Sequence, residues 1–198
     1  MSDLAFLDFE GLIARAHTDP AAEAEVHRRF STVASILVVD FTGMVRRTDS
    51  RGIVYALSRA RFAERTMQLS GTRVKQVADT VFRLYDSPAA ALRDALDAHR
   101  KLHAAVHGSD DPIRACIGLG HGPMLLIPSQ DCYGAEVNRA FVLGEDVAGG
   151  GETLITDAFL AAHGPLPEGV GSFAAPGDRE REAGFGFHVV SDYREPAR

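Results

Sequence analysis

The sequence is poor in cysteine, in basic residues and in long apolar runs, and each shortage excludes a class of protein. Its two cysteines, Cys116 and Cys132, have no CxxC spacing, which argues against a disulfide framework or structural zinc site and fits a reducing compartment. The 21 basic residues are outnumbered by 27 acidic ones, and a net charge of −6 argues against sequence-independent nucleic-acid binding. No apolar run approaches the roughly 18 residues of a membrane span. The acidic N-terminus also lacks the basic region of a signal peptide, so we expect a cytoplasmic protein.

The chain has the length and composition of one folded α/β-sized domain. Its 198 residues are 45% hydrophobic, which is enough for a substantial core. Residues 1–32 form a helical lead-in, in which Asp19 is placed to cap a helix and Pro20 to occupy its first position. This lead-in is either a docking helix or a connector from an absent regulatory domain. The main domain is expected over residues 33–192, followed by a frayed tail at 193–198.

Hydrophobic periodicity and turn residues predict alternating strands and helices through the main domain. The expected order is a strand at 35–40, a helix at 49–67, a hairpin at 74–84, a helix at 87–107, a hairpin at 113–127 turning at 120–123, a helix at 135–147, a strand at 153–156, a final helix capped by Asp157, and strands at 171–175 and 185–190. This order predicts an α+β fold with a ferredoxin-like βαββαβ core and a C-terminal extension. Helices would pack on one side of a largely antiparallel sheet.

Two carboxylates stand where strands end. Asp40 closes the apolar run that begins at Ser35, and Asp79 lies at the turn of the first predicted hairpin. Such residues can converge on one edge of a sheet, and hard oxygen ligands of this kind suit Mg²⁺ or Mn²⁺ completed by substrate phosphates. A helix cap for Asp40 and an ordinary turn residue for Asp79 remain the alternatives.

Several segments together resemble the class III nucleotide cyclase catalytic domain over roughly residues 33–160. The segments are DFTG at 40–43, KQVAD at 75–79, DCYG at 131–134 and VNRA at 137–140, and they occur in the family's order. The resemblance implies attack of a ribose 3′-hydroxyl on the α-phosphate of a nucleoside triphosphate, with release of pyrophosphate. It also implies two metal ions, Mg²⁺ or Mn²⁺, held by Asp40 and Asp79.

The resemblance assigns further residues to the substrate. The backbone amides of Thr42, Gly43 and Met44 would hold phosphates, and the Phe41 carbonyl would be an additional metal ligand.

Purine choice in the family rests on a lysine and an aspartate, which here are Lys75 and Asp131; this implies ATP and cyclic AMP. An outward strand lysine and a turn aspartate are the alternatives. The family places these residues across a dimer interface from the metal aspartates, which implies a head-to-tail homodimer with composite sites.

Three positions depart from the family pattern. Asn138 matches the transition-state asparagine, but the arginine expected four residues later is Val142. Ala78 replaces the glycine before the second aspartate, and Val45 replaces a threonine. The chain is therefore predicted to be either a slow cyclase or a weakened cyclase-like module that dimerises and binds nucleotide or a partner.

Arg139 is the candidate substitute for the missing arginine. Its side chain could reach the same phosphate, or it could form an ion pair with Glu136 or Asp146.

Other motifs give weaker evidence of function. The GGGE sequence at 149–152 is similar to the diguanylate cyclase signature but lacks its aspartate, and we interpret it as a helix-ending loop. His121 is expected to be a surface or turn histidine, and Cys116 to be inert packing. No Ser-His-Asp or Cys-His constellation can be assigned.

Overall fold

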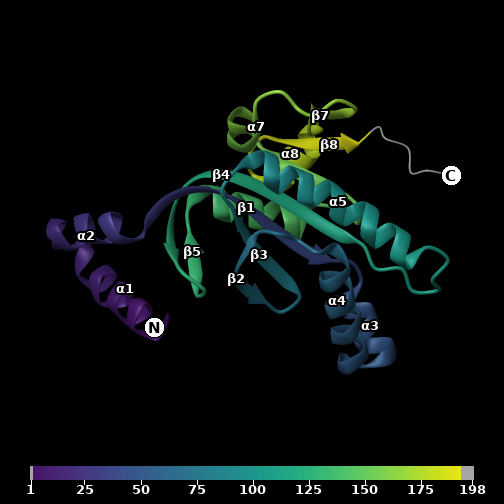
Figure 1. The fold of residues 1–198 in the computed structure, drawn as a ribbon, viewed down its shortest axis with the longest axis horizontal. Helices are drawn as coiled ribbons and strands as arrows, with labels where there is room; N and C mark the ends of the chain where they lie inside the picture. The colour runs from purple at the N-terminus through teal and green to yellow at the C-terminus, as the bar shows by residue number, and fades with distance from the viewer. Residues whose placement is uncertain (1, 193–198) are drawn as a thin grey trace.

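The computed structural model describes residues 2–192, and the predicted tail at 193–198 lies outside them. Eight strands form one sheet in the order β2-β3-β1-β4-β6-β8-β7, with β5 paired to β4 (Figure 1). The strands are β1 (Ser31–Phe41), β2 (Thr72–Val77), β3 (Thr80–Tyr85), β4 (Ala115–Ile127), β5 (Asp131–Tyr133), β6 (Thr153–Thr156), β7 (Val170–Ala174) and β8 (Phe187–Asp192). Every pairing is antiparallel except β4 with β6, which confirms the predicted α+β fold and its largely antiparallel sheet.

The helices lie on both faces of this sheet and not on one side as predicted, because residues of β1 pack in two separate cores, each covered by helices. They are α1 (Ser2–Ala16), α2 (Pro20–Phe30), α3 (Met44–Arg51), α4 (Ile53–Met67), α5 (Pro88–Val106), α6 (Ala135–Val142), the π-helical turn η1 (Leu143–Val147), α7 (Asp157–His163) and α8 (Gly177–Ala183). Strand β1, helices α3 and α4, strands β2 and β3, helix α5 and strand β4 reproduce the predicted βαββαβ order.

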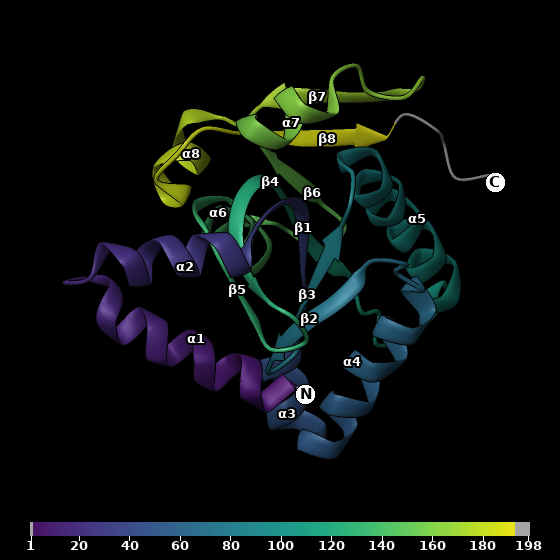
Figure 2. The same ribbon diagram turned by 60° about the vertical axis from the view of Figure 1, so that its left-hand side comes forward.

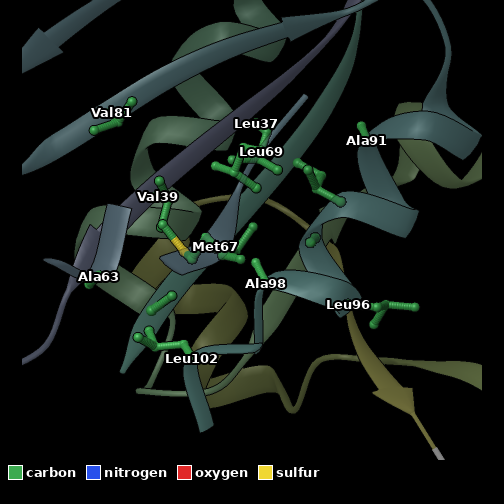
Figure 3. Packing of buried hydrophobic residues seen from close by; sticks show 14 of the residues in the cluster. Leu37, Val39, Ala63, Met67, Leu69, Val81, Ala91, Leu96, Ala98 and Leu102 are labelled. Atoms are coloured by element: carbon green, nitrogen blue, oxygen red, sulfur yellow. The ribbon is translucent and has the colours of Figure 1, made fainter. Parts of the chain in front are cut away.

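Strand β1 is buried on both faces, which explains its unbroken apolar run. Leu37 and Val39 join the core beneath α4 and α5, where they pack with Met67 and other apolar residues (Figure 3). Ile36 and Val38 point to the opposite face and join a second core with Val137 and Ala140 of α6. Strand β1, whose last two residues are Asp40 and Phe41, thus lies between the two cores.

The predicted hairpin at 113–127 is wrong, because β4 runs through it as one continuous strand. Its register with β1 extends from Phe41↔Ala115 to Ser31↔Leu125 without a break. Gly120, which belonged to the predicted turn, serves helix packing instead, and so does Gly118, which precedes that turn. A Cβ at Gly118 would lie 2.1 Å from the Ala140 carbonyl oxygen, and one at Gly120 would lie 2.5 Å from the Glu136 carbonyl oxygen. The chain reverses after Ile127, and β5 follows.

Helix boundaries also differ from the predictions. The helix expected at 49–67 is two helices, α3 and α4, which are separated by Gly52 at φ +86°. The helix expected at 135–147 changes to π-helical turns after Val142. Thr156, and not Asp157, caps α7, because its hydroxyl accepts from the Phe159 amide. Helix α7 is not the final helix, since the short, highly charged α8 follows it.

Helices α1 and α2 form a hairpin that docks on the β4–β5 side of the sheet (Figure 2). A small core joins Phe9, Val26 and Phe30 to Ile127 of β4. The Phe9 ring also stacks on Tyr133 of β5, with centroids 5.6 Å apart. The lead-in therefore makes the contacts of a docking element. Among the described residues no helix combines the length and apolarity that a membrane crossing needs.

Candidate functional site

The pairing of β1 with β3 brings the two predicted metal aspartates together. Val39 pairs with Val81, so Asp40 at the end of β1 lies beside the turn that joins β2 to β3, and Asp79 occupies that turn. The two carboxylates interact with each other at this edge. Asp40 does not cap a helix, because the cap of α3 is Gly43. The predicted convergence is therefore present within one chain.

The environment of Asp40 disfavours its negative charge. Burial raises the pKa of this carboxyl to about 7, and the charges of Asp79 and Glu145 add to the shift, while a hydrogen bond from the Phe41 amide opposes it. A cation between the carboxylates would relieve the repulsion. The donor set of two hard oxygens therefore fits Mg²⁺ or Mn²⁺, with substrate phosphates completing the coordination.

Glu145 is the carboxylate that sequence reasoning missed. It lies in the π-helical turn η1, and its side chain accepts a hydrogen bond from the Thr80 hydroxyl. The same hydroxyl lies 3.4 Å from Asp40 Oδ1. Among the described residues no group of three or more His, Cys, Asp or Glu side chains is placed to hold a metal ion, so Glu145 stands beside the aspartate pair without completing a metal cluster.

The segment from Thr42 to Met44 turns sharply from β1 into α3. Gly43 adopts φ +75°, a conformation that strains residues with a Cβ. The Thr42 amide is already used, since it donates to the Arg114 carbonyl at 3.0 Å. The amides of Gly43 and Met44 lie at the start of α3, where an α-helix leaves amides without intrahelical acceptors. These two amides match the predicted phosphate turn better than Thr42 does.

A buried ion pair holds this turn in place. Arg47 of α3 is 2% exposed, and its Nε donates to Asp111 Oδ2 at 2.9 Å. Its other guanidinium nitrogens donate to the carbonyls of Thr42 and Pro112. The Arg47 hydrogen bond holds the pKa of the Asp111 carboxyl at about 2, and Tyr55 donates to the same carboxylate at 3.0 Å. The Arg47–Asp111 pair, through the bond of Arg47 to the Thr42 carbonyl, thus fixes the backbone directly after Asp40.

The predicted purine-reading residues meet in the folded chain. Lys75 Nζ of β2 lies 2.5 Å from Asp131 Oδ1 at the start of β5, and both side chains are about one quarter exposed. The Lys75 ammonium also sits 4.7 Å from the centroid of the Phe82 ring. Lys75 is therefore not simply an outward lysine, and Asp131 begins a strand instead of a turn. The pair remains accessible enough for a ligand to enter it.

The residues at the predicted transition-state positions have different environments. Asn138 is exposed on α6. Arg139 forms an ion pair with Glu136 at 2.6 Å, which is one of the predicted alternatives, and its guanidinium lies 5.7 Å from the Phe185 ring centroid. Val142 packs against an apolar cluster beside Phe187. The Val142 side chain offers no hydrogen-bond donor, and the replacement of the missing arginine by Arg139 stays a prediction.

Two separate pairs of candidate residues lie apart in one chain. The aspartate pair lies at the hairpin turn, and Lys75 of the other pair lies four residues before Asp79, which is roughly 13 Å of extended chain at about 3.3 Å per residue.

The minor candidates have structural roles. His121 Nδ1 is 2.9 Å from the Ser35 hydroxyl between paired strands, and Cys116 is buried with its thiol pKa raised to about 12 by that burial. The 149–152 loop joins η1 to β6, and Glu152 accepts from the Gly149 amide at 2.7 Å.

Solved structures similar to this fold include nucleotide cyclase domains. An adenylate/guanylate cyclase/hydrolase from Silicibacter pomeroyi is 24% identical with a TM-score of 0.59, covering 66% of this chain and 79% of its own. The guanylyl cyclase domain of the RhoGC fusion protein from the fungus Blastocladiella emersonii gives 12% and 0.66, with coverages of 83% and 98%. Adenylate cyclases from Trypanosoma brucei give 15% and 0.58, with coverages of 84% and 91%.

At the level of sequence alone, no family model and no curated protein matches the chain. The structural likeness to the guanylyl cyclase domain covers most of this chain. The chain therefore has the fold of a class III nucleotide cyclase catalytic domain.

Proposed function

We propose that the chain is a nucleotide cyclase that forms cyclic AMP and pyrophosphate from ATP. The observation that carries the proposal is the meeting of Asp40 and Asp79 at one edge of a cyclase-type sheet, where the charged forms repel each other. Carboxylates held together at such a cost are typical of functional sites. Two Mg²⁺ or Mn²⁺ ions bound there would assist attack of the ribose 3′-hydroxyl on the α-phosphate and neutralise the leaving group.

The protein's own residues bind and orient the nucleotide. The Gly43 and Met44 amides would donate to phosphate oxygens at the start of α3. Lys75 and Asp131 would exchange their mutual contact for hydrogen bonds to the adenine ring, the ammonium as donor and the carboxylate as acceptor. Asn138 would face the phosphates from a second protomer.

The proposed assembly is a head-to-tail homodimer. In each chain Lys75 lies on β2 four residues before Asp79, and the family resemblance places the Lys75–Asp131 pair across a dimer interface from the aspartates that share its nucleotide. Two copies related by a twofold axis would bring the aspartates of one to the purine residues of the other, twice. The expected location of such a protein is the cytoplasm.

A product assay tests the proposal. Purified protein is incubated with Mn²⁺ and each of ATP, GTP, CTP and UTP, and cyclic product is measured. Cyclic AMP is expected to exceed the other products, and GTP as the preferred substrate would overturn the assignment of Lys75 and Asp131. Absence of any cyclic product from a folded dimer would reject the enzyme.

The second candidate is a weakened cyclase-like module that dimerises and binds nucleotide without efficient turnover. The occupation of Arg139 by Glu136 and the packing of Val142 in an apolar cluster favour it. Metal-dependent binding of ATP without product in the same assay would select this reading.

A further inference from the structure

A cavity of about 520 Å³ lies apart from the aspartate pair, since neither Asp40 nor Asp79 lines it. Its walls are the last turns of α5, residues from the segment 107–115 and the glycines at 150–151. This volume falls within the roughly 300–1,000 Å³ of small-molecule sites. The proposed function uses none of the side chains that line it.

The lining of the cavity is basic or neutral, in contrast to the acidic chain as a whole. His103, His107 and Arg114 face it and are exposed, and no Asp or Glu occurs among the described residues that line it. The Arg114 guanidinium makes no ion pair within the described part of the chain. An arginine of this kind is suited to a carboxylate or a phosphate.

Further donors stand close to Arg114. His103 and His107 are one helical turn apart, with ring centroids separated by 5.9 Å, and an imidazole can donate an N–H group in either protonation state. The Ser109 oxygen accepts from the Asp111 amide, which leaves the hydroxyl proton available to a ligand. The set is therefore rich in donors.

The floor of the cavity is apolar. Leu102, Val106 and Ile113 line it and belong to the main core, with Leu102 and Ile113 almost fully buried. A ligand with an apolar body could lie on this floor while its charged group reached Arg114. We propose that the cavity is a binding site for a small organic anion, an apolar body bearing one carboxylate or phosphate group.

The cavity is joined to the candidate phosphate turn through two residues of its rim. The backbone of Arg114 forms two hydrogen bonds with Thr42, one from the Thr42 amide and one to the Thr42 hydroxyl. Gly150 lies against both, because a Cβ there would be 2.6 Å from Thr42 Cγ2 and 3.1 Å from Arg114 Cβ. An anion that forms an ion pair with Arg114 would therefore affect the backbone of Thr42, next to Gly43.

Phenyl phosphate is a suitable probe of the site, and its binding is measured by isothermal titration of the full chain. Saturable one-to-one binding is expected, and Arg114→Gln should weaken it about tenfold or more because a charged hydrogen bond is lost. The double variant His103→Gln, His107→Gln should weaken it by a smaller factor. Arg93→Gln removes the same charge from an exposed position of α5 outside the cavity, and its binding should match the wild type.

Backbone amide NMR tests the link to the turn. Phenyl phosphate should shift the Thr42 and Gly43 amide resonances of the wild type, and should leave them unmoved in Arg114→Gln. Inorganic phosphate serves as a second probe, and binding as tight as that of phenyl phosphate would overturn the apolar half of the proposal.

Three results would overturn the anion site. Equal binding in Arg114→Gln and Arg93→Gln removes Arg114 from it. Loss of binding in Asp79→Ala, or competition by ATP, assigns the probe to the nucleotide site. Because the C-terminal end of α5 favours cations, Zn²⁺ is titrated separately, and tight Zn²⁺ binding that depends on both histidines, without phenyl phosphate binding, would show a cation site. None of these readouts requires cyclase activity.

Discussion

At the scale of single residues, Asp40 and Asp79 carry the proposed chemistry. We predict that Asp40→Ala or Asp79→Ala abolishes Mn²⁺-dependent nucleotide binding while the chain stays folded, because each removes one of two hard oxygen donors and also relieves charge repulsion. Isothermal titration with a non-hydrolysable ATP analogue measures this. Asp49→Ala, at an exposed position of α3, is the matched control. Unchanged metal-dependent affinity in both site variants would remove the aspartates from the site.

Asp111 gives the protein an acid-sensitive stability. Its pKa is held at about 2, below the ordinary 3.8, chiefly by the Arg47 hydrogen bond. The unfolded chain binds this proton more readily, so the contribution to stability is complete above about pH 4 and is lost as pH falls toward 2. Urea unfolding at about pH 5 and about pH 3 should show the decline.

The variant Asp111→Asn checks the assignment. It leaves Arg47 buried without its counter-charge, so unfolding free energy at neutral pH should fall by about 3–5 kcal/mol. The decline of stability between pH 4 and pH 2 should also become shallower than in the wild type. Asp110→Asn, at the exposed neighbouring position, should show neither effect. An unaltered pH profile in Asp111→Asn would refute the role of this pair.

Ala78 is strained at the hairpin turn. It adopts φ +52°, the left-handed region in which a Cβ costs about 1–2 kcal/mol. Ala78→Gly should therefore raise the unfolding free energy, by about 0.5–1 kcal/mol after the greater entropy of glycine in the unfolded state is subtracted. Chemical denaturation measures the change. A loss of stability would mean that the alanine methyl makes contacts that outweigh the strain.

At the scale of elements, the close contact of α6 with β4 depends on glycines of β4, which have no side chain. Gly118→Ala would place a methyl group 2.1 Å from the Ala140 carbonyl oxygen, so we predict destabilisation by about 1–3 kcal/mol or more. Gly11→Ala in α1 is the control, because a Cβ there meets no atom within 4 Å and should stabilise the helix by up to about 1 kcal/mol. Thermal unfolding of both variants measures the contrast, and equal effects would show that α6 can move away.

The same contact explains where prediction from sequence succeeded and failed. The apolar run of β1 and the caps Asp19 and Ser87 are local signals, and the structure confirms the elements that they predicted. The glycines of β4 are not local signals. The dipeptide Gly122-Pro123 indicates a turn when only neighbours along the chain are considered. Gly118 and Gly120, however, are required by the close approach of the α6 backbone, which no spacing in the sequence reveals.

The candidate site likewise contains residues that the sequence predicted and one that it did not. The turn that carries Asp79 and the strand end that carries Asp40 follow from short motifs, and the structure brings them together. Glu145 could not be found from sequence, because the helix was predicted to continue as α-helix to Val147 and a π-helical turn shifts the direction of every later side chain. Its approach to Thr80 depends on that irregularity.

At the scale of the whole molecule, the proposed composite sites predict complementation between inactive chains. Asp79→Ala lacks a metal ligand, and Asn138→Ala lacks a transition-state donor, so each homodimer should be inactive. A heterodimer of the two should contain one site with both defects and one intact site. Mixing after subunit exchange should therefore restore activity, up to about a quarter of the wild-type value if chains pair at random.

Subunit exchange must be shown independently, for example by fluorescence transfer between labelled chains. A mixture no more active than its parents, with exchange established, would place each site within one chain. Mixing Asp40→Ala with Asp79→Ala is the negative control, because both defects fall in the same half-site and every heterodimer site keeps one of them.

The Thr80 hydroxyl stands where β1, the hairpin turn and η1 meet, and it faces two acceptors with a single proton. It donates mainly to Glu145, and Asp40 Oδ1 lies farther away at 3.4 Å. A hydroxyl can serve only one carboxylate at a time. If η1 moved away from β3, the Thr80 hydroxyl would donate its hydrogen bond to Asp40 instead of Glu145. If η1 returned, the hydrogen bond to Glu145 would form again. Movement of η1 away from β3 would thus reach Asp40 as the gain of one hydrogen-bond donor.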